Sequence, residues 1–298
     1  MKILITGASG FIGLPLLNKL VEQGHELLAL TRAPLKEIKS VTFLKADLSL
    51  PSTYLEVISA FQPEVVIHLA WEGIPDFSFK NSKNNLNYSL DFFSHIISLG
   101  CCKKIVVSGS CFEFNKFNGE CLESYRGFPK DSFTWAKHSL LLWLETECNN
   151  SGISLGWLRI FYVFGPRQRS ESLVPSIVTN LINGNLPQIK TPKNANDFVY
   201  IDDVVEAFSN ATIMNFPSGI YNLGSGTSTS ILEVCRETEK VILGTDILTR
   251  KLENESEDSV VSSNFWANIN KSKIYLNWQP SVNLKQGILK TWQWSQNK

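Results

Sequence analysis

The stretch Ile3-Leu-Ile-Thr-Gly-Ala-Ser-Gly-Phe-Ile-Gly13 decides the fold of this chain. An apolar run breaks into Gly7, Gly10 and Gly13, and an apolar stretch with helical spacing follows at once. This order predicts a strand, a tight glycine turn and the first turn of a helix. Such a turn presents backbone N–H groups and a helix N-terminus to a pyrophosphate. A glycine turn in an ordinary α/β domain is the plainer alternative, but the flanking strand and helix patterns favour a dinucleotide site.

Strand-like and helix-like segments alternate through the first half of the chain. The strand-like runs are residues 2–6, 26–31, 41–44, 65–70, 104–108 and 154–160, and the helix-like runs include 11–21, 86–99 and 133–148. Strands that alternate with helices predict a parallel sheet covered on both faces, and right-handed crossovers would make it doubly wound. The expected fold class is therefore α/β, a Rossmann sheet with a smaller, interleaved C-terminal α/β substrate domain.

The alternating pattern loosens after Gly165. We expect a dinucleotide-binding domain over residues 1–165 and a mainly substrate-binding domain over residues 166–298, with a segment around residues 195–213 returning to the first domain. No low-complexity linker separates the two halves. The second half is therefore expected to pack on the first half rather than to move on a tether.

Composition excludes several classes of function. The chain has 28 Lys+Arg, 28 Asp+Glu and 43% hydrophobic residues, so it has no basic field for nucleic acid and is typical of a globular protein. No apolar run is long enough for a bilayer, and the glycine motif begins too early to leave room for a signal peptide. The six cysteines form no zinc or CxxC pattern. We expect a cytoplasmic protein with reduced thiols, no metal, and no nucleic-acid or membrane partner.

Cofactor choice is expected at the end of the second strand. An acid there binds the 2′-hydroxyl of NAD, whereas an arginine suits the 2′-phosphate of NADP. This strand ends Thr31-Arg32 with no acid, which favours NADP over NAD, unless Arg32 is only a solvated surface residue. Asp47 and Leu48 follow the third strand, where the edge of the adenine is expected. Asp47 could instead cap a helix that begins near Ser52.

The chain resembles the extended short-chain dehydrogenase/reductases, in particular the nucleotide-sugar epimerases, dehydratases and 4-keto reductases. The resemblance runs nearly end to end, over segments 6–13, 65–70, 106–114, 158–166, 197–203, 221–226 and 276–280. It implies a nicotinamide cofactor held by the glycine turn and the segments beside it. The implied contacts, with those already named, are Gly7, Gly10, Phe11, Ile12, Gly13, Leu69, Ala70, Lys137, Tyr162 and Val163.

The same resemblance implies a catalytic Ser or Thr, a Tyr and a Lys, with the Lys four residues after the Tyr on one helix face. Ser110 and Lys137 match, but the tyrosine position holds Phe133, whose ring neither donates nor accepts a proton. In an altered natural enzyme Ser110, Tyr125, Lys137 or a water would replace the phenol. Phe133 is also consistent with an engineered change, or with a binding protein that has lost the chemistry. Ser110 could also simply cap a turn.

Two positions after the catalytic hydroxyl bear on the reaction. The 4,6-dehydratases of the family carry an Asp-Glu pair there, whereas this chain has Cys111 and Phe112, which supply no carboxylic acid. This difference argues against dehydration and leaves 4-keto reduction or epimerisation. Substrate contacts are expected from Ser110, Cys111, Phe112, Asn85 and Arg167. Asn85 is expected to open a helix, where it could equally be an N-cap, and Arg167 could be a solvated arginine.

The resemblance thus implies an NADP-dependent reductase of a nucleotide-diphospho-4-keto-deoxysugar, which would supply surface polysaccharide such as the O-antigen of lipopolysaccharide. A nucleotide-sugar epimerase and a catalytically silent cofactor-binding protein are the alternatives. The apolar faces of residues 86–99 and 133–148 could pair two subunits through four helices, so we expect a homodimer.

Overall fold

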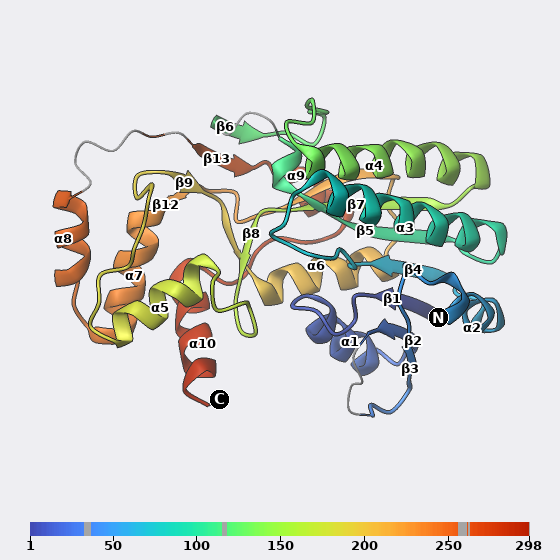
Figure 1. Ribbon diagram of the computed structural model, residues 1–298, viewed down its shortest axis with the longest axis horizontal. Helices are drawn as coiled ribbons and strands as arrows, with labels where there is room; N and C mark the ends of the chain where they lie inside the picture. Colours follow the sequence, from blue (N-terminus) through green and yellow to red (C-terminus); the bar gives the residue numbers. More distant parts are fainter. Residues whose placement is uncertain (33–36, 115–117, 256–260, 262, 298) are drawn as a thin grey trace.

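The computed structural model describes residues 1–32, 37–114, 118–255, 261 and 263–297. Its centre is a seven-stranded parallel sheet with the strand order β11-β7-β5-β4-β1-β2-β3 (Figure 1). These strands are β1 (Lys2–Thr6), β2 (Glu26–Thr31), β3 (Val41–Lys45), β4 (Val65–His68), β5 (Lys104–Ser110), β7 (Ser154–Ile160) and β11 (Gly219–Leu223). Every neighbouring pair in the sheet is parallel, which confirms the predicted α/β fold.

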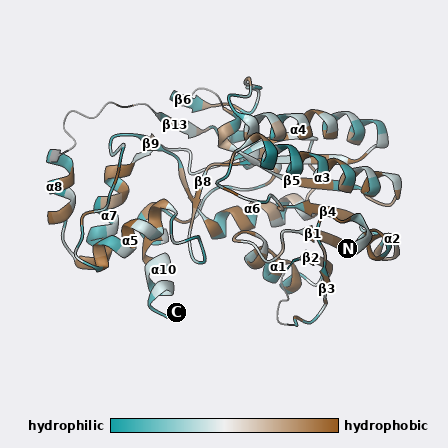
Figure 2. Cartoon of the chain, in the orientation of Figure 1, coloured by the Kyte–Doolittle hydropathy of each residue, from teal (hydrophilic) through white to brown (hydrophobic). Residues whose placement is uncertain are grey.

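The central strands are continuous apolar runs because helices cover both faces of the sheet. Ile3, Leu4 and Ile5 of β1 are fully buried. Since successive side chains of a strand point to opposite faces, Ile3 and Ile5 join one hydrophobic core and Leu4 joins the other. Figure 2 shows the result as predominantly hydrophobic strands between helices of mixed colour.

Two groups of helices form the outer layers (Figure 1). Helices α1 (Gly13–Glu22) and α6 (Ile201–Ile213) contribute to the core that contains Ile3 and Ile5. Helices α2 (Leu55–Phe61), α3 (Phe79–Ser98) and α4 (Ser132–Ser151) contribute to the core that contains Leu4. Among the described helices, none combines the length and apolarity needed to cross a membrane.

Helix α3 begins earlier than the sequence indicated. Ser78 is its N-cap, with a side chain that accepts a hydrogen bond from Asn81 N. Asn85 therefore lies inside the helix, and the expectation that Asn85 opens it is wrong. The polar residues of the first two turns, from Asn81 to Asn84, hid this start because they interrupt the apolar spacing on which the prediction relied.

Both halves of the chain contribute to the large sheet and to the smaller sheets. From the second half, α6 covers the large sheet and β11 pairs with β7. From the first half, β6 (Asn118–Cys121) joins a four-stranded sheet with the order β12-β9-β13-β6, whose other strands are β9 (Ala195–Asn196), β12 (Thr229–Ser230) and β13 (Asn264–Ala267). A third, two-stranded sheet pairs β8 (Tyr162–Phe164) with β10 (Phe198–Tyr200).

The remaining helices belong to the second half of the chain. They are α5 (Leu173–Ile182), α7 (Ile231–Leu243), α8 (Ile247–Glu255), α9 (Asn270–Tyr275) and α10 (Leu284–Gln296). In Figure 1 α5, α7, α8 and α10 form a lobe on the left, away from β1, β2 and β3. The strand order of the large sheet reverses between β1 and β4, and such a reversal opens a crevice at the carboxyl ends of the strands.

Candidate cofactor and active site

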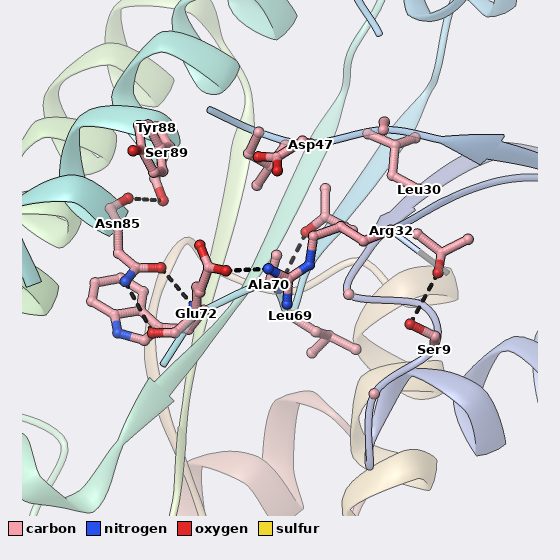
Figure 3. A pocket seen from close by; sticks show the side chains of 17 residues that line it. Ser9, Leu30, Arg32, Asp47, Leu69, Ala70, Glu72, Asn85, Tyr88 and Ser89 are labelled. Atoms are coloured by element: carbon pink, nitrogen blue, oxygen red, sulfur yellow. Dashed lines mark hydrogen bonds and ion pairs between the residues drawn. The ribbon is translucent and has the colours of Figure 1, made fainter. Parts of the chain in front are cut away.

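A pocket of about 230 Å³ opens at the carboxyl ends of β1, β2, β3 and β4 (Figure 3). The structure brings together in its wall eight of the predicted cofactor residues and one predicted substrate residue: Gly7, Gly10, Thr31, Arg32, Asp47, Leu48, Leu69, Ala70 and Asn85. The wall also contains residues that sequence reasoning missed, among them Ser9, Trp71, Glu72 and Tyr88. We call this the adenosine pocket, after the half of the cofactor predicted for it.

The glycine turn forms the base of the adenosine pocket. Gly7 has a φ of +69°, and a Cβ on it would lie 2.8 Å from Ala70 N. A Cβ on Gly13 would lie 2.1 Å from Gly7 O, so α1 can only start this close to the turn with glycine there. No side chain caps α1 at Ile12. Leu14 N already donates to Gly10 O and Pro15 has no N–H, so in this turn the N–H of Gly13 is the one placed to bind an anion.

Three predicted residues line the far end of the pocket. Thr31 Oγ1 donates to Ser9 Oγ at 3.0 Å, and the Arg32 guanidinium forms an ion pair with Glu72. Asp47 Oδ1 accepts from both Ser49 Oγ and Ser49 N, and these two hydrogen bonds lower the pKa of Asp47. The Asp47 carboxylate thus holds the turn at Ser49, ahead of the short helix at Pro51–Thr53 that it was alternatively expected to cap.

Asn85 positions the loop that follows β4. Its Oδ1 accepts from Glu72 N at 2.7 Å, and its Nδ2 donates to Glu72 O at 3.1 Å. His68, at the end of β4, is fully buried between the Thr6 and Ser89 hydroxyls, and burial lowers its pKa to about 3. Neutral His68 therefore anchors the pocket floor, a role that no short sequence pattern announces.

Lys137 lies on α4 with only 3% of its surface exposed. Its Nζ donates to Ser108 O at 2.8 Å and lies 4.0 Å from the centroid of the Trp71 ring. Burial lowers the pKa of Lys137 to about 7, although the nearby Glu113 carboxylate opposes this shift. The side chain can therefore gain or lose a proton near neutral pH.

Ser110 ends β5 and caps the turn that follows. Its Oγ accepts from Phe112 N at 3.2 Å, while Glu113 Oε1 accepts from Ser110 N at 2.7 Å. The alternative reading of Ser110 as a cap is thus correct, but it does not exclude a role in chemistry. The cap uses a lone pair, and the hydroxyl proton makes no hydrogen bond to another described residue.

A buried ion pair supports this turn. Arg159 Nε lies 2.8 Å from Glu113 Oε2, and the two side chains are 1% and 2% exposed. Trp157 Nε1 also donates to both Glu113 oxygens, at 3.0 and 3.1 Å. Both partners of the ion pair fall inside segments that were quoted for the family resemblance, but nothing in their spacing indicated the pairing. The carboxylate ties the Ser110 turn to β7.

Phe133 lies one helical turn before Lys137, on the face where the resemblance places the phenol. Only 4% of it is exposed, and its ring packs against Trp71 and Phe77, with centroid distances of 5.6 and 4.7 Å. Phe77 also meets Phe112 at 6.0 Å. We call Trp71, Phe77, Phe112 and Phe133 the aromatic cluster. It surrounds the tyrosine position with carbon, so Phe133 is a well-packed apolar side chain.

The other predicted residues lie outside the adenosine pocket. Tyr162 and Val163 are half-buried in β8, and the Tyr162 ring meets Phe112 at 6.0 Å. Burial raises the pKa of Tyr162, so its phenol stays protonated.

Cys111 is 4% exposed and packs in the core, and Arg167 is exposed with a φ of 70°. Phe11 and Ile12 are half-buried beside the start of α1. In the described part of the chain, no group of three His, Cys, Asp or Glu could hold a metal ion.

The class of protein follows from these features together with the comparisons. Residues 3–224 match the model of the NAD dependent epimerase/dehydratase family, and the chain belongs to this family. This confirms the resemblance to the extended short-chain dehydrogenase/reductases, whose relatives here are nucleotide-sugar reductases, dehydratases and epimerases.

Individual relatives cover nearly the whole chain. The dTDP-4-dehydro-6-deoxyglucose reductase of Escherichia coli is 27% identical, over 96% of this chain and 95% of its own length. The fold is similar to that of the UDP-glucose 4-epimerase of Thermotoga maritima, solved with UDP-glucose, at 22% identity and a TM-score of 0.83 over 100% and 99% of the two chains. It is also similar to the UDP-glucuronic acid 4-epimerase of Bacillus cereus, solved with NAD, at 22% identity and a TM-score of 0.80 over 99% and 96%.

Proposed function

We propose that the protein is an NADP-dependent reductase of a nucleotide-diphospho-4-keto-deoxysugar that serves surface polysaccharide synthesis. The observation that carries this proposal is which side chains occupy the turn after β5. Ser110 is retained at this turn and Lys137 on α4, but Cys111 packs in the core and Phe112 joins the aromatic cluster. A dehydratase needs a carboxylic acid at this turn, whereas a ketone reduction needs only a hydride and one proton. A reductase among the relatives supports the same reading.

The residues of the adenosine pocket fit a nicotinamide dinucleotide. The glycine turn leaves no room for a Cβ at Gly7 or Gly13, and the uncapped start of α1 suits the pyrophosphate. We assign Arg32 to the 2′-phosphate, Asp47 to the edge of the adenine and Lys137 to the ribose beside the nicotinamide. When bound, the reduced nicotinamide supplies the hydride.

The chain itself must supply the proton. We assign the hydrogen bond to the keto oxygen to Ser110, whose hydroxyl proton is not used by the cap. When the carbonyl carbon gains a hydride, the C=O π pair moves onto oxygen, and Ser110 would give that oxygen its proton. We assign to Lys137, which is buried and titrates near neutrality, the supply of a proton relay that restores the Ser110 hydroxyl.

A catalytically silent cofactor-binding protein is the second candidate, and the packing of Phe133 favours it. The ring makes edge and tilted contacts with Trp71 and Phe77, which leaves the tyrosine position without a polar group. A site selected only for binding would tolerate this arrangement, since positioning of the cofactor does not require a phenol.

Turnover measurements separate the two candidates. Purified protein is mixed with NADPH and a panel of dTDP-, CDP-, GDP- and UDP-linked 4-keto-6-deoxyhexoses, and oxidation of NADPH is followed by absorbance. The reductase predicts oxidation with at least one sugar and loss of it in Lys137→Met. Tight NADPH binding without turnover across the panel would instead support the silent protein.

We also propose a homodimer in the cytoplasm. The outer surface of the helix pair α3 and α4 carries exposed apolar side chains, with Phe79 at 59%, Leu142 at 48% and Trp135 at 37%. The Phe79 and Trp135 rings meet at 5.8 Å, so this surface joins both helices. All six cysteines are free, which suits a reducing compartment. Sedimentation of the unmodified protein and of Leu142→Glu tests the dimer, which the charge should dissociate.

A further inference from the structure

Two side chains of opposite charge meet across the mouth of the adenosine pocket. Arg32 follows directly after β2, and Glu72 lies in the loop after β4. Figure 3 shows the two side chains extended toward each other above Leu69 and Ala70, where they form an ion pair. Both line the same pocket. The pair therefore spans the two sides of the site assigned to the adenosine half of the cofactor.

The structure fixes Glu72 in this position through its backbone. Glu72 N donates to Asn85 Oδ1, and Glu72 O accepts from both Asn85 Nδ2 and Asn81 Nδ2, at 3.1 and 3.0 Å. Asn85 is buried in α3 with 6% of its surface exposed. The loop thus presents the carboxylate to Arg32 from a well-held backbone, and only the side chain of Glu72 remains free to move.

The charges at the mouth of the pocket reduce its attraction for an added phosphate. Arg32 interacts with two carboxylates, since it pairs with Glu72 and also helps to keep Asp47 ionised. Coulomb energies add, so the repulsion from the two carboxylates offsets part of the attraction that Arg32 offers to a third anion. A 2′-phosphate must compete with Glu72 for the guanidinium and must also approach the Glu72 carboxylate. A 2′-hydroxyl carries no charge and meets neither obstacle.

We propose that Glu72 is a cofactor-selectivity residue: by pairing with Arg32 across the adenosine pocket, it weakens the binding of NADP relative to NAD. The inference rests on the proposed function only in that the pocket holds the adenosine half of a nicotinamide dinucleotide. Arg32 alone would create a preference for NADP. Glu72, in the loop after β4, therefore reduces this preference. Arg32 and Glu72 together therefore set the relative affinity of this pocket for NADP and NAD.

The test is equilibrium binding of NADPH and NADH to the full-length protein, followed by nicotinamide fluorescence or calorimetry. Because exposed ion pairs are worth little, Glu72→Gln should tighten NADPH binding by about three- to fivefold and leave NADH within about twofold. The gain should shrink as salt is raised. Glu145→Gln is the matched control, since Glu145 forms an exposed pair with Arg126 away from this pocket, and it should change neither affinity.

A second pair of variants shows whether Glu72 acts through Arg32. In an Arg32→Ala background, Glu72→Gln should improve NADPH binding by less than in the unmodified protein. An equal gain in both backgrounds, or an unchanged NADPH affinity in Glu72→Gln, overturns the inference. These outcomes are distinct from failure of the proposed function. NADH binding better than NADPH to the unmodified protein would remove the NADP assignment, yet Glu72→Gln must still improve NADPH binding if the inference holds.

Discussion

The adenosine pocket and the aromatic cluster lie next to each other, with Trp71 in both, but they differ in how they are built. The pocket is open and lined by both polar and apolar groups, and its base is a glycine turn formed by neighbours in the chain. The cluster is apolar and partly buried, and it joins a loop after β4, the turn after β5 and the start of α4. The glycine turn that would hold the cofactor can therefore be predicted from a short stretch of sequence. The surroundings of the proton-donating group depend instead on tertiary packing.

Lys137 lies at the border between the two regions, and its surroundings show how packing sets chemistry. The Trp71 ring centroid lies 4.0 Å from its ammonium, and Ser108 O accepts a hydrogen bond from it. A cation over an aromatic ring is stabilised by the ring quadrupole, but removal from water disfavours the charge more strongly here, so the pKa of Lys137 falls to about 7.

The largest expected effect comes from the buried ion pair behind the cluster. Glu113→Ala leaves Arg159 buried without its partner, so the free energy of unfolding should fall by about 3–5 kcal/mol, measured by urea denaturation. Glu145→Ala removes one partner of an exposed pair and should cost at most about 1 kcal/mol. Equal losses in the two variants would show that the turn after β5 does not depend on this carboxylate.

The next prediction places a phenol in the aromatic cluster, at residue 133. Phe133→Tyr places a hydroxyl one helical turn from Lys137, and general acid catalysis contributes at least about a hundredfold, so turnover of 4-keto sugars should rise by about that factor. Steady-state kcat with NADPH measures it. Phe133→Leu is the control, because it changes the packing without adding a proton donor. A loss of turnover in Phe133→Tyr would mean that the site is organised around the phenyl ring.

The pH dependence should come from the lysine. Protonated Lys137 is the form that returns a proton, and its pKa is about 7, so kcat should be constant below that pH and fall as pH rises through about 7. A full pH profile of kcat in the unmodified protein measures this limb. Residual turnover in Lys137→Met should lack it. The same limb persisting in the variant would assign the titration to another group.

The smallest expected effect concerns Arg32 in the adenosine pocket. Arg32→Ala should weaken NADPH binding by about fivefold, because an exposed charge contact contributes little, and should leave NADH unchanged, so that any preference for NADPH disappears. Titration of both cofactors measures the two affinities. If NADPH and NADH lost affinity equally, Arg32 would be supporting the pocket wall rather than reading the 2′ position.

The sequence predicted the large sheet better than the site. Continuous apolar runs such as residues 65–70 announce buried parallel strands, and all six predicted strands of the first half are in the sheet. The start of α3 was missed because its first turns are polar, and with it the true place of Asn85. The ion pair between Glu113 and Arg159 was missed because it joins residues 46 positions apart, whose proximity depends on β5 lying beside β7.

By itself the sequence determined the fold class, the glycine turn, and the absence of a phenol at residue 133. These are local matters of spacing, backbone conformation and side-chain chemistry. Only the tertiary structure decided that Trp71 covers Lys137, that Asn85 holds the loop after β4, and that Glu72 meets Arg32 across 40 positions of sequence. The reason is physical: such contacts exist only once strand order has brought separate loops to one edge of the sheet, and no short stretch of residues encodes that order.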